Sequence, residues 1–245
     1  MKSIILIAMA VLAVVGIYKL IPGIFAAKGN AAYSDGDIKK ALKYYEKAIK
    51  LSGGNAQHKT AYSVMLMRTG NFKKAEQLLN EVILYGGAKT NEKINAKLFR
   101  CMVYQKTDRL DEALEDAEEI FETFKNTTVY GLIGYLRQLK GGAELDLCLE
   151  AYDYNSDDRD ICDNLVVAYI RSEELEKAEE IAKDLRENFP AFVEGFYHSA
   201  IIAKMRGEKA LAKEYLEAIK DCKRTMMTTI REEEINALRE EIENA

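Results

Sequence analysis

The sequence predicts an all-α protein in which helix hairpins repeat along the chain. The first observation is a copied segment: the opening of residues 36–51, a Gly followed after four residues by an Ala, returns at residues 70–75. The second is composition, because two prolines, no tryptophan and 31% charged residues suit helices, and alternation of the β type is absent. The third is that both copies continue with apolar residues at helical spacing, as expected of a helix hairpin repeat.

The repeat can be followed by the small residue that comes after each turn. The aligned positions are Ala41, Ala75, Ala113, Leu147, Ala178 and Ala212, separated by 34, 38, 34, 31 and 34 residues. This register predicts six hairpins, near residues 22–55, 56–93, 94–127, 128–158, 159–192 and 193–222. The four extra residues of the second step are expected in a longer loop near residues 88–92.

The first two units illustrate the predicted hairpin. In the first, helices over residues 24–34 and 38–51 flank a turn at residues 35–37. In the second, one helix passes through Tyr62 and Leu66, a turn follows at residues 69–71, and the next helix passes through Ala75 and Leu79. In the fourth unit, four glycines in the first helix and turn should loosen the local structure.

This pattern resembles the tetratricopeptide repeat family over about residues 22–222. The matching small, aromatic and proline positions are Ala41, Tyr45, Ala48, Tyr104, Ala113, Tyr169, Ala178, Ala182, Pro190, Ala200 and Ala212. The second unit departs from the family pattern at Ser63 and Leu66, and the fourth at Leu147. The resemblance implies a right-handed α-solenoid of about six hairpins.

An apolar segment precedes the repeats. Residues 3–18 carry no charge, and the stretch of about 19 residues up to Ile21 is long enough to cross a bilayer. We predict a transmembrane anchor over residues 1–21, ended by Pro22-Gly23. The alternative is a cleaved signal peptide, against which Lys19 interrupts the apolar run. The excess of lysines after the segment, with four unpaired cysteines, favours a cytosolic repeat domain.

Residues 223–245 predict a further helix beyond the repeats. Thr229 and Glu232 have the spacing of a capping box, and Ile235, Leu238 and Ile242 form a narrow apolar stripe. A polar cap on the last repeat is the simpler interpretation, because terminal repeats need a solvated outer face. A helix that docks a partner is the alternative.

Composition and motifs offer little chemistry. The net charge of −5 and the lack of basic clusters disfavour nucleic-acid binding. The four cysteines form no metal-binding or redox pair, and His58 and His198 have no catalytic partners at recognisable spacing. Residues 153–160 begin like a calcium loop but lack its Gly and final Glu, so Asp residues that cap the next helix are expected. We therefore expect no enzyme activity, metal or cofactor; an unrecognised site in a helical-repeat enzyme is the alternative.

The family resemblance assigns a concave groove to the fifth, ninth and twelfth positions of the first helix in each hairpin. The expected partner-binding residues are Tyr33, Val64, Met67, Leu98, Met102, Gln105, Leu132, Leu136, Leu139, Val167, Ile170, Tyr197 and Ile201. Their apolar middle suits an amphipathic helix or an extended hydrophobic segment. The alternative is that some belong to the inter-repeat core or are covered by the C-terminal helix.

Cations recur at the thirteenth position of four units, namely Arg68, Lys106, Lys140 and Arg171. They either balance the negative C-termini of helices or contact an acidic partner segment. Together these observations predict a membrane-tethered, non-enzymatic scaffold whose groove binds a protein or peptide; an exported interaction protein is the alternative. No oligomeric state is indicated.

Overall fold

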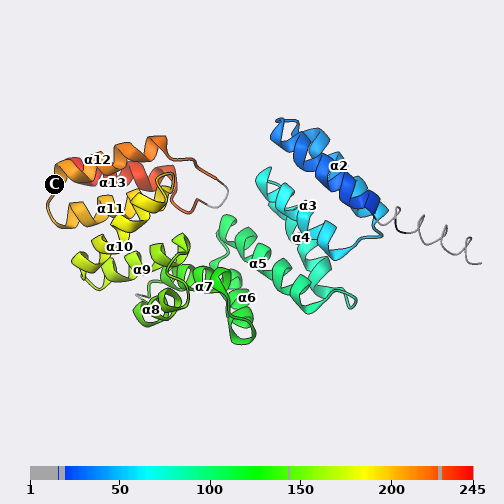
Figure 1. The fold of residues 1–245 in the computed structure, drawn as a ribbon, viewed down its shortest axis with the longest axis horizontal. Helices are drawn as coiled ribbons and strands as arrows, with labels where there is room; N and C mark the ends of the chain where they lie inside the picture. The colour runs from blue at the N-terminus through cyan, green and yellow to red at the C-terminus, as the bar shows by residue number, and fades with distance from the viewer. Residues whose placement is uncertain (1–15, 17–19, 143, 226–227, 245) are drawn as a thin grey trace, which may run out of the picture. The chain divides into compact units, whose positions relative to one another are not determined.

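The computed structural model describes residue 16 and residues 20–142, 144–225 and 228–244, and within these it contains helices and no strands. The helices follow one another in antiparallel hairpins (Figure 1). After a first helical stretch over residues 20–34 they are α2 (Ile38–Leu51), α3 (Ala56–Arg68), α4 (Phe72–Leu84), α5 (Thr90–Lys106), α6 (Leu110–Thr123), α7 (Thr127–Leu139), α8 (Leu145–Tyr154), α9 (Arg159–Arg171), α10 (Leu175–Asn188), α11 (Val193–Met205), α12 (Lys209–Ala218), the 3₁₀ turn η1 (Ile219–Asp221) and α13 (Glu232–Asn244).

Six hairpin turns share a residue with a positive φ at the same place, which confirms the predicted repeat. In each, the residue two positions after the end of the first helix has a positive φ; these residues are Gly36, Gly70, Asp108, Gly141, Glu173 and Gly207. In five of these turns, after Gly36, Gly70, Asp108, Glu173 and Gly207, the next N–H reaches back to a carbonyl in the last turn of the helix, as Asn71 N does to Leu66 O at 2.8 Å. This is the hydrogen bond of a Schellman C-cap, and in these five turns the chain reverses within three residues.

Polar caps begin several of the helices where the sequence places Asp or Asn. The side chains of Asp37, Asn71 and Asn126 each accept an N–H three residues ahead, at 3.0, 3.4 and 2.9 Å. Asp158 accepts from the N–H groups of Asp160 and Ile161 at 3.1 Å, so the acidic segment 153–160 caps α9 as predicted. Each cap satisfies a donor that has no partner within its helix.

The chain divides into two compact units, one up to Asp116 and one from Ala117 onward. In the first unit, α2 contacts α3, α4 contacts α5, and the successive first helices α3 and α5 also meet. Ala41, Ala75 and Ala96 have no exposed surface, so small residues permit these close helix contacts. Between the first two hairpins, the Tyr45 and Tyr62 rings stack with centroids 6.0 Å apart.

The second unit repeats the scheme with α7 to α12. Gln138, which is 4% exposed, donates to the carbonyl of Asn164 at 2.7 Å, and the Asn164 amide donates to the carbonyl of Gly131 at 2.8 Å. At Gly134 an added Cβ would lie 3.0 Å from Nδ2 of Asn164. This glycine, which the sequence suggested would loosen the helix, allows α7 and α9 to approach closely.

Helix α13 packs where the first helix of a following hairpin would lie, because it contacts α12 and α11. The predicted stripe of Ile235, Leu238 and Ile242 is buried in this contact. The predicted capping box is wrong. The helix begins at Glu232, and Thr229 lies before it, where its N–H and hydroxyl donate to Oε1 of buried Glu194 at 2.6 and 3.0 Å. Glu234 instead accepts the N–H of Arg231.

Two further boundaries differ from prediction. Residues 20–34 are all helical, so Pro22-Gly23 do not end a helix there; proline removes only its own donor, and its φ is compatible with a helix. The expected loop over residues 88–92 is also wrong, because α5 begins at Thr90 and is 17 residues long where α3 is 13. Part of the insertion is therefore an extra helical turn.

No helix among the described residues is both long and apolar enough to cross a bilayer. The predicted anchor over residues 1–21 falls largely on residues 1–15 and 17–19, which lie outside the described part of the chain. The anchor therefore stays a prediction.

Candidate functional site

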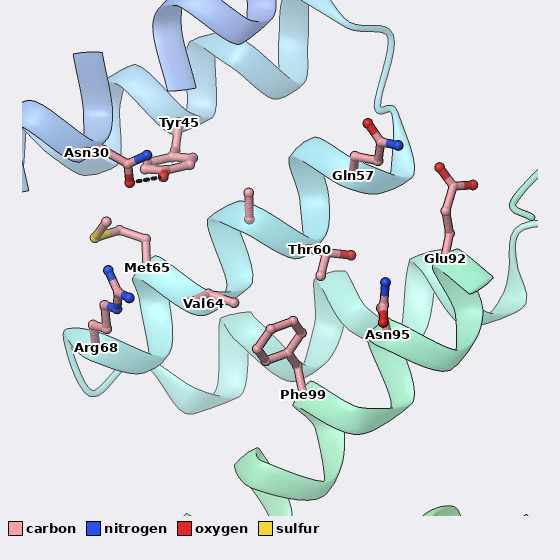
Figure 2. A pocket seen from close by; sticks show the side chains of 11 residues that line it. Asn30, Tyr45, Gln57, Thr60, Val64, Met65, Arg68, Glu92, Asn95 and Phe99 are labelled. Carbon is pink, nitrogen blue, oxygen red and sulfur yellow. Dashed lines mark hydrogen bonds between the residues drawn. The ribbon is translucent and has the colours of Figure 1, made fainter. Parts of the chain in front are cut away.

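A pocket of about 360 Å³ lies within the first unit and is lined mainly by the first helices of three successive hairpins (Figure 2). We call it the N-terminal pocket. Its lining consists of Asn30, Tyr45, Gln57, Thr60, Ala61, Val64, Met65, Arg68, Glu92, Asn95 and Phe99. Side-chain amides and a hydroxyl surround a small apolar centre, so the pocket offers both hydrogen-bonding groups and apolar contact.

The floor of the pocket is one face of α3. Gln57, Thr60, Val64 and Arg68 follow one another at intervals of three or four residues, which places them in one row along the helix. The opposite side of α3 carries Leu66, which is 1% exposed. The burial of that apolar side turns the mixed row toward the pocket.

Asn30 is held in place by a residue of the second helix of its own hairpin. The hydroxyl of Tyr45 donates to Oδ1 of Asn30 at 2.6 Å. Tyr45 is 4% exposed, and burial raises the pKa of its phenol, which therefore stays protonated and a donor. With Oδ1 engaged, the amide nitrogen of Asn30 is the group oriented to donate to a ligand.

The two ends of the pocket carry opposite charges. Arg68 ends α3, and its guanidinium lies 5.5 Å from the centroid of the Tyr33 ring. Glu92 lies at the other end, beside Asn95 (Figure 2), and its carboxylate accepts the N–H of Lys89 at 2.8 Å. Since Arg68 is 11 residues beyond Gln57 on α3, the pocket extends roughly 16 Å along that helix.

Helix α5 forms the remaining wall through Glu92, Asn95 and Phe99, which share one helical face. The predicted groove omits Asn95 and Phe99 because it takes only the fifth, ninth and twelfth positions of a unit that starts at residue 94. It omits Glu92 because that residue precedes the start of the unit. The extra turn at the start of α5 adds Glu92 to the wall. Residues 89–93 are all polar, so apolar periodicity gave no signal for this turn.

In the first unit, the pocket includes part of the predicted groove. Val64 and Arg68 line the pocket, and Tyr33 contacts Arg68 beside it. Leu98, Met102, Gln105 and Lys106 are half-buried on α5 and do not line it. The prediction that Met67 lines the groove is wrong, because its side chain is 2% exposed and belongs to the core. The pocket is consequently more polar than the predicted apolar trough.

In the second unit, most predicted groove residues pack against the protein itself. Leu136 is fully buried, whereas Leu139 of the same helix is 47% exposed. Tyr197 and Ile201 pack against the core that α13 completes, which confirms for them the alternative of coverage by the C-terminal helix. The remaining three, Leu132, Val167 and Ile170, are half-buried.

Arg171 is committed to a helix end. Its Nη1 donates to the carbonyl of Gln138 at 2.7 Å and to the carbonyl of Gly142. These carbonyls lie at the end of α7 and just beyond it, so the interpretation as balance for a helix C-terminus is confirmed here. Contact with an acidic partner through Arg171 is not supported. Lys140 is exposed and follows the same helix end.

Three buried cysteines are poorly suited to act as nucleophiles. Burial raises the pKa of Cys101, Cys148 and Cys162 to about 12, so these thiols stay protonated and poorly nucleophilic. Within the described residues, no three His, Cys, Asp or Glu side chains are arranged to hold a metal ion. The N-terminal pocket is therefore the candidate site, and its groups suit binding.

Comparison with known proteins agrees with this fold. Residues 32–92 match the sequence model of the family described as tetratricopeptide repeat. A tetratricopeptide repeat protein from Parabacteroides merdae superposes with a TM-score of 0.70 at 15% identity, covering 92% of this chain and 85% of that one. PilF of Pseudomonas aeruginosa superposes with a TM-score of 0.64 at 11% identity, covering 83% of this chain and 92% of that one.

The Cut9–Hcn1 hetero-tetramer of the APC/C gives a TM-score of 0.68 at 12% identity, covering 89% of this chain and 42% of that one. These identities are low, so the likenesses establish the fold alone. No curated protein sequence matches this chain significantly.

Proposed function

We propose that this chain is a non-enzymatic scaffold that binds a partner protein, because residues 32–92 match the tetratricopeptide repeat model and the fold is that of a tetratricopeptide repeat protein. The N-terminal pocket is the proposed binding site. The observation that carries this proposal is the row of amide and hydroxyl groups on three successive helices around an apolar centre. A chain of the Cut9–Hcn1 hetero-tetramer shares the fold, and that protein therefore works within a complex of two different proteins.

The proposed ligand is a short extended segment of the partner. Asn30, Gln57 and Asn95 carry both donors and acceptors, which can pair with the N–H and C=O groups of an extended backbone. Val64 and Phe99 would contact an apolar side chain between them. A length of roughly 16 Å corresponds to about five extended residues. An amphipathic helix is less favoured, since its backbone groups are already paired.

Charge gives the segment a direction. An acidic residue is expected beside Arg68 and a basic one beside Glu92. These end contacts contribute mainly to orientation, because Arg68 is exposed and water screens its interactions.

The apolar residues 3–18 support the further proposal that the scaffold is tethered to a membrane, with the repeats on the cytosolic side. Cell membranes washed in alkaline carbonate should retain a tethered chain. Protease added outside intact cells should leave the repeats uncut. Release by carbonate would refute the tether, and cutting of the repeats from outside would favour the exported alternative.

Partner binding can be tested with peptide libraries displayed against the full chain in detergent. Peptides enriched on the native chain should bind at least tenfold more weakly to the Asn95→Ala and Val64→Glu variants. The Arg68→Glu variant should disfavour peptides with an acidic residue at one end. Lys140→Glu, which alters an exposed cation outside the pocket, is the matched control. Equal binding to all variants would place the partner elsewhere.

A further inference from the structure

The first hairpin differs in charge from the rest of the chain. Residues 20–55 contain six lysines and three acidic residues, a net charge of +3, whereas residues 56–245 have a net charge of −10. A positive segment within an acidic protein points to a local anionic partner and not to general solubility.

Four of the lysines form a row on α2. Lys39, Lys43, Lys47 and Lys50 are spaced by four, four and three residues, which confines them to an arc of roughly 80°. All four are exposed, and the buried Ala41, Tyr45 and Ala48 lie on the opposite side of the helix. The row therefore faces solvent along the length of α2.

An aromatic side chain joins this row to the preceding helix. The ammonium groups of Lys47 on α2 and Lys28 on the helix over residues 20–34 lie 4.3 and 5.8 Å from the centroid of the Phe25 ring. Phe25 also lies 6.1 Å from the Tyr44 ring. Lys28, Lys39, Lys43, Lys47 and Lys50 thus form one surface across both helices, which we call the lysine face.

Two of the three acidic residues of the hairpin, Asp37 and Glu46, have other partners. Glu46 accepts hydrogen bonds from Tyr62 and Lys74 of the next hairpin, both at 2.9 Å, and the carboxylate of Asp37 caps α2. Neither carboxylate pairs with a residue of the lysine face in these contacts. The positive charge of the face is thus left for a ligand.

Position along the chain favours a lipid surface as that ligand. The apolar residues 3–18 end only ten residues before Lys28, so an inserted anchor would hold the hairpin against the headgroups. Leu20 and Ile24 of the first helix are 66% and 52% exposed, which suits the apolar layer just below them. Phe25 and Tyr44 add aromatic contact at the same level.

We propose that the lysine face binds the anionic headgroups of a bilayer, so that the first hairpin lies along the membrane surface. This rests on the proposed tether. Near an anionic surface each lysine is expected to strengthen the contact about fivefold, and high salt weakens it. Without the face, an anchored hairpin would be free to stand away from the bilayer.

A single tryptophan can report this contact, because the chain has none. Lys40 is exposed, lies beside the lysine face and is ten residues, roughly 15 Å, from Lys50. The full chain with Lys40→Trp would be reconstituted in neutral phosphatidylcholine vesicles and in vesicles containing phosphatidylglycerol. In anionic vesicles, emission should shift to shorter wavelength and brominated acyl chains should quench it; about 0.5 M salt should reverse both effects.

The matched variants separate the lysine face from net charge. Glutamine at residues 39, 43, 47 and 50 together should abolish the shift. Glutamine at four exposed lysines elsewhere, Lys73, Lys183, Lys213 and Lys223, should preserve it. The proposal would be overturned if chains that float with anionic vesicles kept the emission of a solvent-exposed tryptophan. It would also be overturned if the two fourfold glutamine variants lost the emission shift equally. Failure to float with neutral vesicles would count against the tether instead.

Discussion

The Nδ1 of His198 lies 2.6 Å from Oδ1 of Asp163, and this contact joins α11 to α9 inside the second unit. Both residues are buried, at 9% and 8% exposure. Burial by itself lowers the pKa of His198, but the charge of Asp163 and its hydrogen bond, with Glu194 and Glu234 nearby, outweigh it and raise the pKa above its ordinary value.

The pair should make stability depend on pH. Because the pKa of His198 is raised on folding, its contribution is fully present below about pH 6.5, the pKa in the unfolded chain, and is lost as the pH rises through the folded pKa. At low pH, the free energy of unfolding of the His198→Gln variant, measured with urea, should be about 3 kcal/mol lower than that of the native chain. It should not show this decline as the pH rises. His58→Gln, the control at the other histidine, should retain it. A decline that persists without His198 would contradict the assignment.

Gly29 should be intolerant of a side chain. A Cβ there would lie 2.7 Å from two ring carbons of Tyr45, so Gly29→Ala must displace the ring that holds Asn30. We expect a loss of about 1 to 3 kcal/mol, with weaker peptide binding.

Gly23→Ala provides the comparison in the same helix, because a Cβ at Gly23 has no atom within 4 Å. That variant should gain up to about 1 kcal/mol from helix propensity. Thermal unfolding followed by circular dichroism measures both changes. Similar effects at the two glycines would show that close packing at Tyr45 is unimportant.

A charged side chain should lower stability strongly at one leucine of α7 and hardly at all at another. Leu136→Glu buries a carboxylate in a fully enclosed position and should cost at least about 3 kcal/mol. Leu139→Glu, three residues along and 47% exposed, should change stability by less than about 0.5 kcal/mol. Helicity and urea midpoints distinguish them. Native-like stability of Leu136→Glu would place that side chain at a surface.

Glu173 occupies a turn position that glycine fills in several other hairpins. Its φ is +60°, where a side chain is strained, and its counterpart Gly70 has a φ of +76°. Glu173→Gly should therefore stabilise the chain by about 1 kcal/mol, and Gly70→Ala should destabilise it by a similar amount. A lower unfolding temperature for Glu173→Gly would mean that the Glu side chain contributes more than its backbone strain costs.

The sequence predicts the hairpins well, because their signals are local. Residues 38–51 form the predicted helix, since Asp37 caps its start and Ala41, Tyr45 and Ala48 give it one buried face. The turn at Gly36 is equally local, because a positive φ favours glycine. Such signals need no knowledge of neighbouring hairpins.

The site is less predictable, because exposure depends on which helix lies across a face. Met67 and Leu136 have the spacing of groove residues, yet neighbouring side chains bury them. Tyr197 and Ile201 are covered because α13 follows the last hairpin. Thr229 has a capping spacing, but a buried carboxylate 35 residues earlier in the chain binds it instead. These outcomes depend on contacts between distant segments, which periodicity does not encode.

The extra turn of α5 suggests how such an array can diversify. The extra turn lies at the start of α5, before Ala96, and does not alter the spacing of the residues that follow in the third hairpin. Ala96 and Ala113 therefore remain fully buried. Yet it adds Glu92 to the lining of the N-terminal pocket. Insertions of about one helical turn at such joints can therefore change specificity while the stacking of the hairpins is conserved. Descendants of one repeat could acquire new ligands through changes in length as readily as through substitution.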